Sequence, residues 1–236
     1  MRKPEPTLAP QQARSRESLK KLLKAAVEVL GQQGVAGTTI PRIAAHAGLT
    51  PGAVYRRFRN KDVLLEIAIL SILEDQDKFL RLSLSVEAAA EIPFPTLAEQ
   101  VINSLVVSYR ANANLLRAVR QLLQEKEGTP FWKKAAKLEM RAFEHLVDIL
   151  VTSGRGIEHA DLRAAVALGL VMIIGTLCEV VVNPGDIKLW RGLLPKDDKT
   201  LKGELTKSFL SYLGVERKTS DSGSPSGLVE SVATSL

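Results

Sequence analysis

Cysteine, histidine and recognisable catalytic motifs are scarce in this chain. Its 236 residues include a single cysteine, Cys178, so no intramolecular disulfide can form, and zinc fingers and redox cysteine pairs are excluded. There are three histidines, and no G-x-S-x-G, P-loop or paired-cysteine motif occurs. His145 and Asp148 have i, i+3 spacing, but a satisfied polar helix face explains that pair better than a metal site does. We expect no enzyme, no metal and no cofactor.

Strand-forming patterns and signals for export are also missing. Runs of alternating β-branched residues are absent, while Leu and Ala dominate a composition that is 45% hydrophobic, which predicts an all-α protein. The N-terminus lacks the apolar core of a signal peptide. The uncharged segment 164–178 is shorter than the ~20 residues of a spanning helix, so we expect a core or interface helix there, no membrane partner and a cytoplasmic protein.

Positive charge is concentrated at the N-terminal end. Residues 1–62 contain 12 Lys and Arg against 4 Asp and Glu, whereas residues 63–236 contain 20 against 22. A basic head on a nearly neutral body predicts a polyanionic partner for the head alone.

The chain divides into four predicted parts. We expect a flexible arm at 1–13, a helix-turn-helix domain at 14–62, a helical ligand-binding and dimerisation domain at 63–215, and a disordered tail at 216–236. Helices of the larger domain are predicted near 96–112, 114–126, 130–153, 158–182 and 198–213.

Capping residues mark the short helices of the head. Thr39 is suited to cap a second helix with its hydroxyl on the N–H of Arg42, and Gly48 suits the left-handed position that closes that helix. Thr50 then caps a third helix, which Pro51 enters in its first turn. The turn between them is three residues long, the spacing of a helix-turn-helix.

The third helix has the composition of a helix inserted into DNA. Val54 and Phe58 are spaced to face the core, small residues crowd the N-terminus, and Tyr55 and Arg56 project outward. A helix N-terminus attracts phosphate, and arginine can form paired hydrogen bonds with phosphate or guanine. A solvated turn in an ordinary bundle remains the simpler alternative for this pattern taken by itself.

The string TTIPRIAAHAGLTPGAVYRRFRNKDVLL resembles the DNA-binding domain of the tetracycline-repressor (TetR) family of bacterial transcription regulators. The resemblance covers residues 19–65. It implies that Thr39, Thr50, Tyr55 and Lys61 contact phosphates, that Arg42 and Arg56 reach bases or backbone, and that Pro51, Gly52 and Ala53 lie against the DNA. Arg57 stands where the family often has histidine, so its role is left open.

The same resemblance implies partners for the rest of the chain. Such proteins are usually homodimers, here through helices near 158–182 and 198–213, with Val166, Leu170, Ile173, Ile174 and Leu177 as the expected apolar stripe. A small-molecule effector would bind among the central helices and release a near-palindromic DNA operator, so we expect a repressor. The alternative is a helical small-molecule-binding or adaptor protein with a non-functional head.

Overall fold

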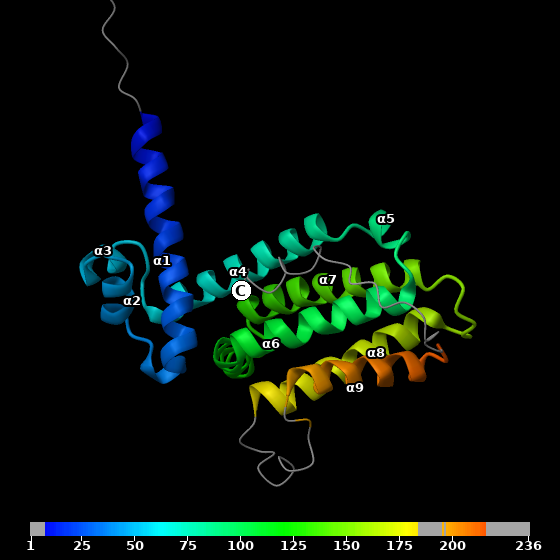
Figure 1. The fold of residues 1–236 in the computed structure, drawn as a ribbon. Helices are drawn as coiled ribbons and strands as arrows, with labels where there is room; N and C mark the ends of the chain where they lie inside the picture. The colour runs from blue at the N-terminus through cyan, green and yellow to red at the C-terminus, as the bar shows by residue number, and fades with distance from the viewer. Residues whose placement is uncertain (1–7, 184–194, 196, 216–236) are drawn as a thin grey trace, which may run out of the picture.

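The computed structural model describes residues 8–183, 195 and 197–215, and among these it contains helices and no strand. Three N-terminal helices form a head at one end of an elongated bundle (Figure 1). They are α1 (Leu8–Gly37), α2 (Ile40–His46) and α3 (Pro51–Tyr55). The bundle consists of α4 (Lys61–Ser83), α5 (Val86–Ala89), α6 (Phe94–Glu125), α7 (Pro130–Ser153), α8 (Leu162–Leu177), a π-helical extension (Cys178–Val182) and α9 (Asp198–Tyr212). The expected all-α fold with an N-terminal helix-turn-helix is confirmed.

Helix α1 is longer than expected. It begins at Leu8 and so includes the second half of the predicted arm of residues 1–13, whereas residues 1–7 lie outside the described part of the chain. Pro10 falls in the first turn, where the missing N–H costs no hydrogen bond. Gly34 then interrupts the helical backbone with φ 64°.

Two predicted helices are one bent helix. The expected segments 96–112 and 114–126 are joined in α6, which departs from helical geometry at Asn112 (φ −116°, ψ 16°). The Asn112 side chain donates to the carbonyl of Ser108 at 3.0 Å, a local bond that competes with the helical ladder. The bend divides α6 into a half that packs within the bundle and a half that reaches the head.

The described residues form two apolar cores. One lies inside the bundle and joins α5–α9. The other holds the head together with residues of α1–α4, but it also includes Leu115, Ala118 and Leu122 of α6 and Phe131 and Ala135 of α7. The predicted domain boundary at residue 62 therefore runs through a continuous core.

Helices α8 and α9 pack side by side along one edge of the bundle (Figure 1). A Cβ built on Gly169 would lie 2.5 Å from the ring of Phe209, so this contact between the two helices requires glycine. Phe209 also stacks on Phe94, with ring centroids 6.3 Å apart. Because aromatic pairs at this distance attract one another, α9 is tied to both α8 and α6.

The apolar stripe expected at a dimer interface is mostly internal. Val166, Leu170, Ile173 and Leu177 are buried in the bundle core, and Ile174 lines a cavity. By length and composition Leu162–Val182 could cross a membrane, but these buried residues show that one face of the segment serves as core. The large apolar residues of α8 that are exposed are Leu168, Val171 and Met172.

Candidate nucleic-acid interface and central cavity

Local capping bonds build the α2–α3 unit. The Thr39 hydroxyl accepts from the N–H of Arg42 at 3.4 Å, and the Thr50 hydroxyl accepts from the N–H of Ala53 at 3.3 Å. Gly48, with φ 67°, makes the turn between the helices. Ile43, Ala44 and Val54 are fully buried, so each short helix is fixed to the head by one apolar face.

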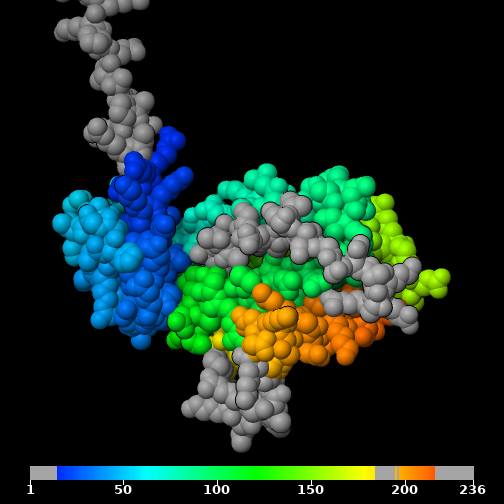
Figure 2. Space-filling model, in the orientation of Figure 1, coloured from blue at the N-terminus to red at the C-terminus, as the bar shows by residue number. Residues whose placement is uncertain are grey.

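The opposite face of this unit is exposed. Figure 1 places α2 and α3 at the outer edge of the head, away from the bundle, and Figure 2 shows the same head as a separate lobe. Thr39, Arg42, Thr50, Pro51, Gly52, Tyr55 and Arg56 are exposed, and Ala53 is half-buried. Eight of the nine predicted contact residues thus lie at or near one solvent-facing surface.

Tyr55, the last residue of α3, and Arg56, which follows it, each have a polar group without an internal partner among the described residues. Tyr55 is 56% exposed, and within the described residues neither its hydroxyl nor the Arg56 guanidinium has a hydrogen-bond partner. A Cβ added to Gly52 would meet nothing within 4 Å, so internal packing does not require glycine there. Free donors beside a residue without a side chain are what close contact with a phosphate backbone needs.

Three basic side chains of the head have internal partners that the sequence did not reveal. Lys61 is half-buried, and its ammonium donates to the carbonyl of Val35 at 3.3 Å. Arg42 donates to the carbonyl of Gly37 at 2.6 Å, and Arg57 donates to the carbonyl of Ser15 at 3.2 Å. Each of them retains donors beyond the one used in its internal bond. Arg56 differs from all three because it has no internal partner among the described residues.

The bundle contains a partly open cavity of about 560 Å³ between α4, α6, α7 and the C-terminal end of α8. Its walls are largely aliphatic and aromatic, and the aromatic residues that line it are Phe79, Tyr109 and Phe143. Phe94 and Phe131 are instead buried in the two cores. A cavity of this size matches a drug-sized ligand.

Titratable side chains form part of the cavity wall. Tyr109, Arg120, Glu139 and Cys178 all line the cavity and interact electrostatically. Burial raises the pKa of the Tyr109 hydroxyl, and the neighbouring Cys178 adds to that rise. Burial of its carboxyl group also raises the pKa of Glu139, which the charge of Arg120 partly opposes. Sequence patterns missed this group, because its members come from different helices.

The comparison with known families fits the head. Residues 22–68 match the family model described as bacterial regulatory proteins of the tetR family. The head is thus a TetR-family DNA-binding domain. The match covers α2, α3 and the adjoining parts of α1 and α4, the same elements that present the exposed surface.

Proteins that are similar to this chain extend the likeness to the TetR family beyond the head. The transcriptional regulator TtgR of Pseudomonas putida is 32% identical over 113 residues, which is 48% of this chain and 51% of that protein. The chain thus spans about half the length of this relative. A crystal structure of a proposed TetR-family regulator from Mesorhizobium loti has a TM-score of 0.64 at 17% identity, covering 85% of this chain and 97% of that one. Bacillus subtilis FadR, in complex with stearoyl-CoA, has a TM-score of 0.55 at 24% identity, covering 82% and 98%. These two structures share the fold.

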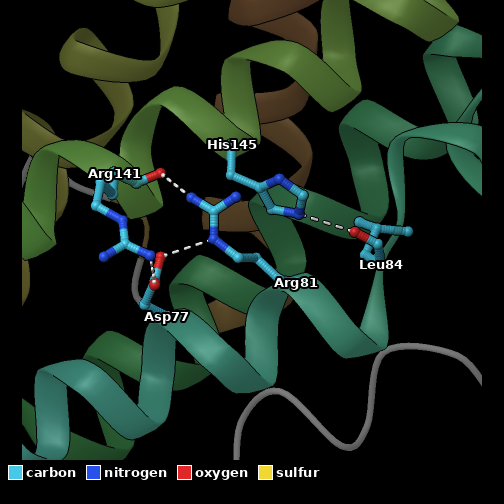
Figure 3. Close-up of polar contacts among 5 residues, drawn as sticks. All are labelled: Asp77, Arg81, Leu84, Arg141 and His145. Atoms are coloured by element: carbon cyan, nitrogen blue, oxygen red, sulfur yellow. Dashed lines mark hydrogen bonds and ion pairs between the residues drawn. The ribbon is translucent and has the colours of Figure 1, made fainter.

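A buried carboxylate links α4 to α7 in this TetR-family fold. Asp77 is 4% exposed and accepts from Arg81 at 3.0 Å and from Arg141 at 2.7 Å (Figure 3). Arg81 also donates to the carbonyl of Arg141, and the His145 ring lies 2.9 Å from the carbonyl of Leu84. Helix α4 begins in the head and reaches this network, so the network fixes the connector between the head and the cavity.

The clustered metal ligands considered for His145 and Asp148 are not found. His145 is buried on the Leu84 carbonyl, and Asp148 pairs with Arg163 at 2.5 Å. Over the ranges that the structure describes, no three His, Cys, Asp or Glu residues are grouped as metal ligands.

Asp77→Asn should lower the free energy of unfolding by about 1.5–3 kcal/mol, because hydrogen bonds to charged groups contribute that much. The matched control is Asp75→Asn on the same helix, where an exposed carboxylate faces Lys78 at 4.0 Å and less than about 0.5 kcal/mol is expected. Urea unfolding measures both. Equal losses in the two variants would contradict the assignment of Asp77 as the anchor of α4.

Proposed function

We propose that this chain is a ligand-responsive transcriptional regulator whose α2–α3 unit binds the major groove of an operator. The observation that carries the proposal is the exposed end of α3, where Tyr55 and Arg56 have no internal partner among the described residues. A short helix fits the major groove, which is about 12 Å wide. Such a regulator acts in the cytoplasm, and occupation of an operator by a bulky protein makes repression the proposed mode.

Each exposed residue has a role in this proposal. Thr39, Thr50 and Tyr55 bind phosphates through their hydroxyls, and Arg56 reaches a base edge or a phosphate. Pro51, Gly52 and Ala53 allow the backbone of α3 to approach the DNA. Arg42 and Lys61 add backbone contacts with the donors that their internal bonds leave free.

A homodimer accounts for the exposed apolar surface of the last helices. Leu168 and Val171 are each more than half exposed, and Met172 and Tyr212 are 46% and 40% exposed. These four residues of α8 and α9 form a surface that we call the α8–α9 face. Pairing of this face with its copy would remove it from water and present two heads to a near-palindromic operator.

The cavity is the proposed effector site. Helix α4 starts in the head at Lys61 and lines the cavity with Leu73, Phe79 and Leu80, so a ligand that displaces α4 also moves the head. Operator release is then a shift between two populated states. The structural neighbour FadR, in complex with stearoyl-CoA, supports a ligand-binding role for this fold.

A helical ligand-binding or adaptor protein with an inactive head is the competing function. A salt series on duplex DNA separates the two, because neutralised phosphates make log affinity fall linearly with log salt, at a slope of about −0.9 per phosphate contact. With three or more phosphate contacts per head we expect a slope steeper than about −5 for a dimer. A flat response would favour the adaptor.

A further inference from the structure

We infer that the cavity takes an uncharged, largely apolar molecule whose polar end both donates and accepts hydrogen bonds. This inference deepens the proposed effector site and rests on it. It concerns the chemical class of the ligand, which the fold alone leaves open.

The composition of the cavity wall indicates that most of the ligand is apolar. Most of the lining side chains are aliphatic or aromatic and come from four helices, with Leu73, Leu105, Leu116, Phe143 and Ile174 among them. Ser104, one of the polar lining residues, already donates to the carbonyl of Gln100 at 2.9 Å. Most of the ligand surface therefore contacts hydrocarbon, and burying that surface supplies most of the binding free energy.

The charged groups on the wall cancel one another. Among the lining residues only Arg120 and Glu139 belong to residue types that carry charge at neutral pH, and they carry opposite signs on α6 and α7. They influence each other electrostatically, yet no hydrogen bond or ion pair within 4.0 Å joins them to each other or to another described residue. Arg120 and Glu139 are both exposed residues, so each can still form hydrogen bonds with a ligand.

Tyr109 adds a neutral donor beside this pair. Burial, together with the charge of and a hydrogen bond with Cys178, raises the pKa of its hydroxyl, so the group is neutral at pH 7. The ligand thus meets donors from Arg120, an acceptor from Glu139, and the Tyr109 hydroxyl, which is already hydrogen-bonded to Cys178. A hydroxyl, amide or similar group can satisfy both kinds of partner at once.

A charged ligand gains less from the same surroundings. A carboxylate would be attracted by Arg120 but repelled by Glu139, and an ammonium would meet the reverse arrangement. In either case the ligand adds one unit of charge to a wall whose own charges already balance, and removal of that charge from water is not compensated. The balance therefore selects against both anions and cations.

Three probes with the same ten-carbon chain test the class by isothermal titration calorimetry on the full chain: decanamide, decanoate and decyltrimethylammonium, each below its aggregation limit. We expect decanamide to bind about tenfold or more tightly than either charged probe, since one uncompensated charge in a partly buried site has at least that effect. Tighter binding of either ion, or no binding of any probe, would overturn the inference.

Two variants should shift the selectivity toward ions of opposite sign. Glu139→Gln leaves Arg120 unopposed, so the affinity for decanoate should rise about tenfold, and Arg120→Gln should do the same for decyltrimethylammonium. Glu144→Gln and Lys133→Gln remove the same charges from exposed positions of α7 outside the cavity lining and should change neither affinity. If the cavity variants behave like these controls, Arg120 and Glu139 do not select the ligand.

DNA retention is measured in parallel to separate this inference from the proposed function. If decanamide binds preferentially but leaves operator affinity unchanged, the ligand class stands and the effector role of the cavity fails. If a charged probe binds best and releases DNA, the effector role stands and the inferred class is wrong.

Discussion

Arg56→Ala is expected to weaken operator binding by about 5- to 150-fold, because an arginine that reaches a base edge contributes about 1–3 kcal/mol of discrimination. The variant should also relax base preference at one position of each half-site. Tyr55→Phe removes a hydroxyl and should weaken binding to all sequences similarly. The measurement is selection of bound duplexes from a random pool, followed by titration of the selected half-site.

Lys133→Ala is the control for this prediction. It removes one positive charge from an exposed position on α7, outside the α2–α3 unit, and should leave half-site affinity and base preference unchanged. Unaltered DNA binding in both Arg56→Ala and Tyr55→Phe would show that the exposed end of α3 is not the reading surface.

Leu168→Glu should convert the proposed dimer to a monomer, because it places an unpaired carboxylate within the α8–α9 face. Loss of the second head removes bivalent attachment, so operator affinity should fall by about 100-fold or more. Sedimentation equilibrium measures the oligomeric state, and circular dichroism verifies that the helices remain folded.

Leu82→Glu is the matched control, since Leu82 is 86% exposed on α4, outside the α8–α9 face. The same change there should leave the oligomeric state as in the parent chain. If Leu168→Glu also remains a dimer, the two copies pair through another surface.

Local chemistry explains why the head was predictable. The caps at Thr39, Thr50 and Asn60 each join a side chain to an N–H three residues away, so the pattern in the chain contains the whole interaction. Val54 and Phe58 are buried as their spacing predicts. The nine contact residues themselves stay a prediction, although the structure leaves most of them exposed.

Non-local contacts explain what the sequence did not reveal. An apolar stripe on α8 predicts a buried face, but the stripe alone does not say whether the chain's own core or a second copy covers it. Val166 and Leu170 proved to belong to the core, whereas Leu168 and Val171 remain exposed. The bond from Lys61 to the Val35 carbonyl spans 26 residues, and the Arg120, Glu139 and Tyr109 group depends on how α6 and α7 pack. The predicted tail at 216–236 lies outside the described residues.

The core shared by the head and the bundle limits how this regulator can be taken apart or recombined. Leu115 of α6 lies against Gly31 of α1, with 3.4 Å between the Leu115 Cβ and a Cβ built on the glycine, and Phe131 completes the same core. A fragment ending at residue 62 would expose the apolar side of α1 to solvent and should therefore aggregate. A chimera that grafts a foreign reading module onto this chain must also transplant the α6 and α7 residues on which that module rests.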